Sequence, residues 1–186
     1  MGMTGASGAI YGYALLRTLA ELNAELHMVM TRMGEQVLKF ECGVSKKQLK
    51  EYGKVWANDN MFAPIASGSF LTRGMVIIPC SMNTLGAIAN GVGDTLLSRA
   101  ASVQLKERRR LIVVPRETPL HLIHLQNMER LLLAGAHIMP ASPGFYQKPT
   151  EIWELTNFMV ARVLDALEID HNLGPRWGDA SPPLED

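Results

Sequence analysis

The sequence predicts an α/β fold: a three-layer sandwich with a mainly parallel sheet of the Rossmann or flavodoxin type and helices on both faces. Short apolar runs of strand length alternate about five times with segments of helical periodicity. No internal repeat or low-complexity tract interrupts this alternation, and 186 residues are enough for one domain with a substantial core. We therefore expect a single domain over 1–186, with 170–186 as an irregular tail.

The first part of the chain predicts two strands and their helices. A short strand should end at the small-residue turn 5–8, which leads into a helix over 9–22 whose apolar residues share one stripe. The apolar run 26–30 predicts the second strand. Helices are expected over 32–40 and, short and polar, over 46–52.

Turn formers at 58–69 predict an ordered loop before the middle of the chain. A strand is expected over 75–79 and a helix over 85–90. Asp94 can cap a further helix that runs to about residue 107.

The last part of the chain contains the stretch around which we expect the site. The apolar run 111–114 predicts a strand, and Thr118-Pro119 can serve as the cap and first position of a helix that ends at about 134. A last strand is expected over 137–140. Thr150 can then cap the final helix.

Composition narrows the partners and the compartment. Lys plus Arg and Asp plus Glu number 18 each, so no global charge indicates nucleic acid or a membrane surface. Cys42 and Cys80 lack metal-like spacing, which fits a reducing cytoplasm, and no apolar segment is long enough to span a bilayer. His121 and His124 have no third ligand, so we expect no metal site. A buried first strand should exceed the residues before Gly5, so we expect further residues upstream.

Two stretches are candidates for binding and chemistry. The turn from Gly5 to Gly8 meets a helix N-terminus, where exposed amides favour an anion; alternatively, the glycines serve only a tight strand-to-helix connection. Arg116 and Glu117 follow a strand at the edge where open parallel sheets bind ligands. The alternative for this pair is an exposed ion pair on a loop.

Cations on helices add to these candidates. Arg99 and Lys106 share one helix face and can reach the same anion, whereas 108–110 is expected to be a solvated helix end. Arg162 lies on a stripe with Leu155, Met159 and Ala166, which favours a ligand or partner contact over snorkelling. These cations accompany a set of hydroxyls, one carboxylate and one tyrosine: Ser7, Thr31, Ser81, Thr84, Glu117 and Tyr146. The set suits a phosphorylated ligand and general acid–base work, in an enzyme or a binding module.

Seven motifs in order identify a resemblance that spans essentially the whole chain. They are Gly5-Ala-Ser-Gly-Ala-Ile-Tyr-Gly12, Ala66-Ser-Gly-Ser69, Pro79-Cys-Ser-Met-Asn-Thr84, Leu105-Lys-Glu-Arg-Arg-Arg-Leu-Ile-Val-Val-Pro-Arg-Glu-Thr-Pro119, Ile123-His-Leu-Gln-Asn-Met128, Pro143-Gly-Phe-Tyr146 and Pro175-Arg-Trp-Gly178. Together they closely resemble the UbiX-type flavin prenyltransferases. The resemblance implies a flavoprotein that attaches a dimethylallyl group from dimethylallyl phosphate to N5 and C6 of reduced FMN. The prenylated FMN would serve a UbiD-type decarboxylase in ubiquinone synthesis or aromatic-acid breakdown.

The resemblance also implies roles for individual residues and an assembly. FMN would be held by Gly5, Ala6, Ser7, Thr31, Ser81, Met82, Asn83, Thr84 and Arg116. The prenyl phosphate would be held by Tyr146, Arg162, Lys106 and Arg99. Catalysis would involve Glu117 and Ser7, which manage protons, with Lys106 and Arg116. Family members form large homo-oligomers, such as dodecamers, that share sites between subunits. This chain departs from the family at Met61, where a tryptophan is common.

Two other functions remain open from the sequence. A related flavoprotein could oxidatively decarboxylate a carboxy-terminal cysteine, but those enzymes usually carry a Pro-x-Met-Asn-x-x-Met-Trp segment that is absent here. An FMN-binding accessory subunit of a decarboxylase complex is the second alternative. Flavin storage alone would not need Glu117, Lys106, Tyr146 and Arg162 together.

Overall fold

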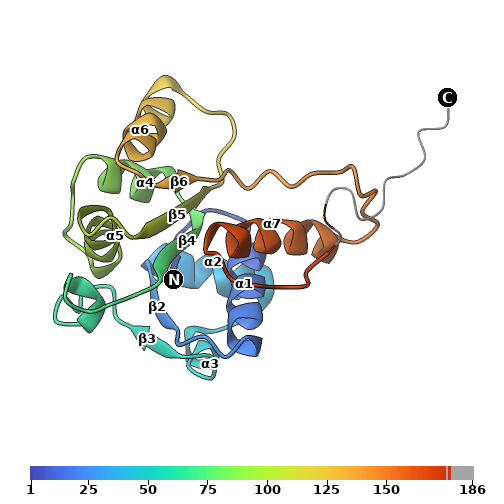
Figure 1. Cartoon of the computed structure of the whole chain (residues 1–186), viewed down its shortest axis with the longest axis horizontal. Coiled ribbons are helices and arrows are strands. Elements are labelled where there is room, and N and C mark those ends of the chain that lie inside the picture. The colour runs from blue at the N-terminus through green and yellow to red at the C-terminus, as the bar shows by residue number, and fades with distance from the viewer. Residues whose placement is uncertain (175, 177–186) are drawn as a thin grey trace.

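A computed structural model describes residues 1–174 and 176, and it contains a six-stranded sheet whose pairings are all parallel, in the order β3-β2-β1-β4-β5-β6. The strands are β1 Gly2–Met3, β2 His27–Met30, β3 Lys54–Trp56, β4 Gly74–Cys80, β5 Arg110–Pro115 and β6 His137–Ile138. The chain thus builds outward from β1 in one direction and then returns to continue from β4 in the other (Figure 1).

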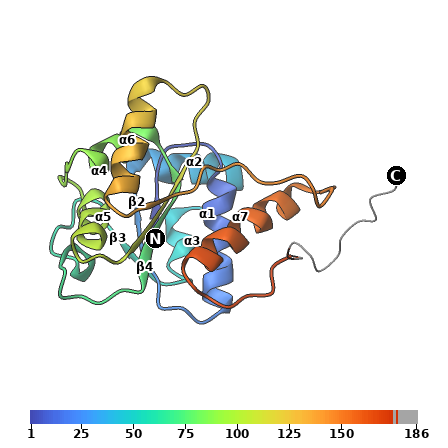
Figure 2. The ribbon, with the colours of Figure 1, turned by 45° about the horizontal axis from the view of Figure 1, so that its top comes forward.

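Helices cover both faces of this sheet (Figures 1 and 2). They are α1 Ala9–Glu21, α2 Arg32–Cys42, α3 Lys46–Leu49, the short 3-10 helix η1 Pro64–Ala66, α4 Met82–Ala89, α5 Leu96–Lys106, α6 Leu122–Leu133 and α7 Ile152–Ala166. Helices α1, α2 and α7 pack on one face, and η1, α4, α5 and α6 pack on the other. The three-layer α/β fold expected from the sequence is confirmed.

The core consists of two apolar clusters, one on each side of the sheet, and β4 contributes to both. Val76 and Ile78 pack with α1 and α7, whereas Met75 and Ile77 pack with α4 and α5. This division follows from the alternation of side chains along a strand. A strand with helices on both sides therefore has to be apolar at successive positions.

Strand β3, Lys54–Trp56, is absent from the sequence-based expectations, which were wrong in ending the sheet at β2. It is an edge strand of three residues and none of them is buried, so it lacks the apolar run that identifies inner strands. Its position is fixed by contacts from elsewhere in the chain. The indole of Trp56 donates a hydrogen bond to His27 Nδ1 at 3.0 Å.

Four helix starts differ from the expectations, because a residue other than the expected one occupies the N-cap position. Helix α6 begins at Leu122 rather than Pro119, and its N-cap is His121. Thr95 caps α5 in place of Asp94. Ser81 starts α4 three residues earlier than expected. Glu151 caps α7 in place of Thr150, whose amide and hydroxyl donate to Glu154 instead.

The tail expected over 170–186 falls only partly within the described residues. Residues 170–174 are irregular, as expected, whereas Trp177, Pro182 and Pro183 lie outside the part that the structure describes. Within the described residues, no helix has the length and apolar character needed to cross a membrane.

Gly34 permits the close packing of α2 against the end of β1, and this gives a stability prediction. A Cβ at this position would lie 2.6 Å from the carbonyl oxygen of Met3, which is backbone and cannot move aside. We expect Gly34→Ala to lower the free energy of unfolding by about 2 kcal/mol, as measured by urea denaturation. Gly93→Ala is the control, since its Cβ meets no atom within 4 Å. Equal stability of the two variants would contradict this packing.

Candidate active site

The loops that follow β1, β2, β4 and β5 gather at the carboxyl edge of the sheet. The strand order reverses between β1 and β4, so this edge has the topological switch point at which open α/β sheets bind ligands. The amide of Thr31 donates to Met3 O at 3.0 Å, and the amide of Arg116 donates to Cys80 O at 3.3 Å. These bonds extend the sheet into the loops and hold them at fixed positions.

Thr4, which directly follows β1, joins two of these loops and is itself buried. Its hydroxyl donates to Pro79 O at 2.9 Å and accepts the amide hydrogen of Ser81 at 2.6 Å. The turn at 5–8 and the start of α4 are thereby placed side by side. This role was not predicted, since a single threonine at a strand end has no distinctive signal.

Two predicted flavin residues cap helices at this edge. The Thr31 hydroxyl accepts from the Gly34 amide at 3.0 Å, and the Ser81 hydroxyl accepts from the Thr84 amide at 3.4 Å. Ser81 also donates to the Thr84 hydroxyl at 3.2 Å. The N-terminus of α4 therefore presents amides and hydroxyls together, a donor set that suits a phosphate.

The turn at 5–8 lies against Arg116, and the resemblance assigns both to FMN. The Arg116 Nε donates to the Ser7 carbonyl at 3.1 Å, and Ser7 is exposed. A Cβ on Gly5 would lie 2.5 Å from the Cβ of Met33, so only glycine allows the turn and α2 to approach this closely. This contact supports the steric explanation for a glycine in the turn.

Glu41 of α2 lies at the same edge and was not predicted from the sequence. Its Oε2 accepts the amides of Gly8 at 2.9 Å and Ala9 at 2.8 Å, so it caps the N-terminus of α1. Partial burial works to raise the pKa of Glu41, but hydrogen bonds from Ser7 and these amides, with the Arg116 charge, hold it below its usual value. The sequence predicted an anion site at the N-terminus of α1, but Glu41 already accepts the amide hydrogens there. The N-terminus of α4 is therefore the better candidate for an anion site.

Glu117 extends from the same edge but makes no ion pair with Arg116. It is exposed, and its carboxylate accepts the amide hydrogen of Thr118 at 3.1 Å. The guanidinium of Arg116 points instead toward Ser7. The ion-pair alternative for these two residues is therefore wrong in this structure, and the carboxylate faces solvent at the ligand edge.

Tyr146 and Arg162 both line a cavity of about 390 Å³, formed between α7 and the segments on either side of it. The Tyr146 and Phe158 rings make an edge-to-face contact with centroids 5.9 Å apart, which gives the cavity an aromatic wall. No residue of the turn 5–8 or of the loop after β5 lines this cavity. Within one chain, the cavity is thus separate from the flavin-type loops.

Arg162 is exposed on α7, so its expected place on the apolar stripe is wrong. The buried face of the helix is formed by Thr156, Met159, Val160, Val163 and Leu164. Arg162 lies outside it, 58% exposed in its side chain, and pairs with Asp165 at 3.1 Å. The intervals of three and four residues from Met159 were compatible with two neighbouring faces, and packing against α1 selected the other one.

Asp165 organises the cationic side of this cavity. Besides Arg162, it accepts from Arg176 at 3.0 Å and from His171 Nε2 at 3.2 Å. His171 Nδ1 accepts the amide of Leu173 at 3.1 Å, which fixes the tautomer that donates to Asp165. Burial opposes ionisation, but the hydrogen bonds of Arg176 and His171 hold the pKa of Asp165 below its usual value.

Arg99 and Lys106 form a third group, on α5. Arg99 Nε donates to Ala66 O at 3.0 Å, and the Lys106 ammonium pairs with Glu107. Lys106 precedes the start of β5, whereas Arg116 follows its end, and six strand residues span roughly 20 Å. The expectation that Lys106 joins Arg116 and Glu117 in one local group is therefore not met within a single chain.

Comparison with known proteins places this chain in a family. The Flavoprotein family model matches residues 1–164. The flavin prenyltransferase UbiX of Halalkalibacterium halodurans is 46% identical, and the match covers 96% of this chain and 92% of that protein. The chain belongs to the UbiX flavin prenyltransferase family. The flavin prenyltransferase UbiX of Pseudomonas aeruginosa is 42% identical, and the match covers 96% of this chain and 93% of that protein.

Solved structures of the UbiX family share the fold in detail. AnUbiX in complex with FMN and dimethylallyl pyrophosphate has a TM-score of 0.94 and 44% identity, covering 97% of this chain and 96% of that chain. A dodecameric FMN-dependent UbiX-like decarboxylase from Escherichia coli O157:H7 has a TM-score of 0.89 and 43% identity. The match covers 91% of this chain and 94% of that chain. A phosphopantothenoylcysteine decarboxylase mutant, at 21% identity and a TM-score of 0.62, shares only the fold.

The capping role of Glu41 gives a prediction for the pH dependence of stability. The pKa of Glu41 is depressed in the folded state, so its stabilising contribution is present above its unfolded pKa and is lost as pH falls through the folded value. We expect Glu41→Gln to melt a few degrees lower at pH 7 and to approach the unmodified chain near pH 3. Differential scanning fluorimetry across pH measures this. Glu51→Gln is the control. If the melting temperature of Glu41→Gln stays below that of the unmodified chain at low pH, the charge argument is contradicted.

Proposed function

We propose that this chain transfers a dimethylallyl group from dimethylallyl phosphate to N5 and C6 of reduced FMN. Membership of the UbiX family and the relative bound to FMN and dimethylallyl pyrophosphate support it. The observation that carries the proposal is the presence of two different binding environments. Flavin-type loops gather at the sheet edge, and a separate cavity combines arginines with an aromatic wall. An FMN-binding accessory subunit would need only the first.

The loops at the sheet edge would hold the flavin. The proposed set is Gly5, Ala6, Ser7, Thr31, Ser81, Met82, Asn83, Thr84 and Arg116. The start of α4 supplies amides and hydroxyls for the FMN phosphate, and Arg116 supplies a cation. Reduced FMN supplies the electron-rich atoms to which the prenyl group is joined.

The second cavity would bind the prenyl phosphate and favour its ionisation. Departure of the phosphate leaves positive charge on the allyl group and adds negative charge to the leaving group. The faces of Tyr146 and Phe158 can stabilise the former, and Arg162 the latter, without a metal. Arg99 and Lys106 would complete the phosphate site.

Proton movements fall to two carboxylates. The Ser7 hydroxyl hydrogen-bonds to the Glu41 carboxylate, so Ser7 can pass its hydroxyl proton to Glu41 as Ser7 Oγ takes one from the flavin. Glu117 projects from the loop after β5 and can exchange a proton with a second atom of the flavin. We therefore add Glu41 to Ser7 and Glu117 as proton-handling residues.

We further propose that the complete site forms only in a homo-oligomer, and that the oligomer is a dodecamer. The flavin loops, the Tyr146 cavity and the Lys106 group lie apart within one chain. A structure of a similar protein is dodecameric. The product would pass to a UbiD-type decarboxylase, and the site of action would be the cytoplasm.

The direct test mixes the protein anaerobically with reduced FMN and dimethylallyl phosphate, with mass spectrometry to detect prenylated FMN. We expect an adduct from the unmodified chain. Glu117→Gln should bind FMN within about twofold but form adduct at least tenfold more slowly, as for loss of general acid–base catalysis. Glu129→Gln, on α6, is the matched control. No adduct despite bound FMN would refute the enzyme proposal, and equal loss of binding would make Glu117 structural.

Site sharing predicts complementation between two inactive variants. Lys106→Ala and Glu117→Gln should each be poorly active alone. If copies share sites, co-expressed mixed oligomers contain some sites with both native residues and should regain about a quarter of the activity when the two chains mix randomly. Co-expression of Glu117→Gln with a Glu117→Gln, Lys106→Ala double variant is the control and should regain none. Activity in the mixed sample no greater than the sum of the single variants would place both residues in one chain.

A further inference from the structure

Arg109, which immediately precedes β5, binds the backbone of the loop 66–72 between η1 and β4. Its Nη1 donates to Phe70 O at 2.8 Å, and its Nη2 donates to Gly68 O at 2.6 Å. The expectation of a solvated helix end is therefore wrong for Arg109, which is half-buried, whereas its neighbour Arg108 is exposed. The fixed fork of a guanidinium matches two carbonyls of one loop, and the ammonium of a lysine does not.

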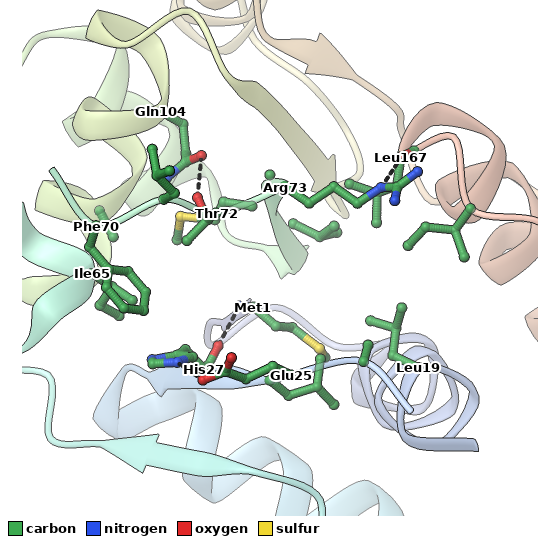
Figure 3. Close-up of a pocket in the computed structure, with 18 of the residues that line it drawn as sticks. Met1, Leu19, Glu25, His27, Ile65, Phe70, Thr72, Arg73, Gln104 and Leu167 are labelled. Carbon is green, nitrogen blue, oxygen red and sulfur yellow. Dashed lines mark hydrogen bonds and ion pairs between the residues drawn. The ribbon is translucent and has the colours of Figure 1, made fainter. Parts of the chain in front are cut away.

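The same loop is tied to α5 at both of its ends. At its start, Arg99 Nε donates to Ala66 O at 3.0 Å. At its end, the Thr72 hydroxyl donates to Gln104 Oε1 at 3.1 Å, and Gln104 is buried (Figure 3). The two hydrogen bonds of Arg109 hold the part of the loop that lies between these ends.

The middle of this loop lies directly against Lys106. A Cβ at Gly68 would be 2.7 Å from Lys106 Nζ, so a glycine is what allows the ammonium and the loop backbone to approach this closely. Arg99 and Lys106 are the two α5 cations proposed for the prenyl phosphate, and both contact the same loop. Movement of the loop would therefore shift both charges.

Arg109 also acts on the carboxylate that pairs with Lys106. The hydrogen bond and charge of Lys106, and after them the charge of Arg109, hold the pKa of Glu107 below its usual value. This second effect needs only a positive charge, whereas the two hydrogen bonds to the loop need a guanidinium. A lysine at position 109 keeps the charge and removes the fork, so it separates the two roles.

We propose that Arg109 is a positioning residue of the prenyl-phosphate site, which holds the loop 66–72 so that Arg99 and Lys106 keep fixed places around the phosphate. The role of Arg109 depends on the proposed function, in which these two cations bind the phosphate. Charges that are held in place before the substrate binds need no reorganisation during the reaction. A loop that the substrate has to order uses part of the binding free energy, which weakens the affinity.

A second arginine fork in the same chain provides a control for general stability. Arg73 Nε donates to Leu167 O at 3.1 Å (Figure 3), and the same guanidinium donates to Glu168 O. This fork closes the end of α7 and does not hold the loop 66–72. Arg73→Lys should lower the melting temperature by a few degrees, as Arg109→Lys should, without changing the affinity for dimethylallyl phosphate. Equal loss of affinity in both variants would assign the effect to general stability and overturn the proposal.

Hydrogen exchange measures the order of the loop itself. The Phe70 amide donates to Ser67 O at 3.3 Å, so its exchange rate reports whether this turn of the loop is formed. We expect Arg109→Lys to speed exchange at Phe70 by about tenfold, and saturating dimethylallyl phosphate to slow it again, because loop order and ligand binding are coupled. Unchanged exchange at Phe70, or faster exchange that the ligand does not slow, would contradict the positioning role.

The deciding experiment is a calorimetric titration of dimethylallyl phosphate into the full-length protein loaded with oxidised FMN, which lacks the electron-rich atoms of the reduced form and is not prenylated. We expect Arg109→Lys to bind dimethylallyl phosphate about tenfold more weakly and FMN within about twofold, as for the loss of hydrogen bonds to a charged group. Arg108→Lys, at the exposed neighbour, is the matched control and should bind both as the unmodified chain does. Equal affinity of Arg109→Lys and the unmodified chain would overturn the role of Arg109 alone. No binding by the unmodified chain would refute the proposed function as well.

Discussion

The hydrogen bonds of Thr4 fix the relative positions of the two halves of the sheet at the edge where ligands bind. Strand β1, Gly2–Met3, lies between β2 and β4 at the centre of the sheet and pairs with both. The Thr4 hydroxyl extends that pairing to Pro79 and Ser81, in a buried position where each lost bond is costly. The turn at 5–8 and the start of α4 depend on it, and with them the whole proposed flavin site.

The chemistry proposed for this chain needs groups that one copy keeps apart. The flavin loops lie at one edge, the Tyr146 cavity lies beside α7, and Lys106 precedes β5. The surface of the chain is consistent with assembly, since α6 exposes several large apolar side chains: Leu122, Ile123, Leu125, Leu132 and Leu133. Exposed apolar surface of this extent is typical of interfaces. An oligomer would cover it and also bring the groups together.

Sequence reasoning singled out candidate residues whose signal is local. The turn at 5–8 and the loop with Arg116 were both singled out because a glycine turn and a strand end are recognisable within a few residues, and the structure brings the two segments together. Glu41 was missed because nothing near it in the chain indicates a role, and it reaches the α1 amides only through the packing of α2 beside α1. Arg162 was misplaced because helical periodicity leaves two neighbouring faces possible until a partner helix selects one.

The sequence by itself determined the layered α/β architecture, since apolar periodicity fixes the type of each element, and it identified the family through motifs in order. The tertiary structure decided the strand order, the edge strand β3, the helix caps and which cations lie together. These features depend on contacts between residues distant in the chain, which no local sequence pattern records.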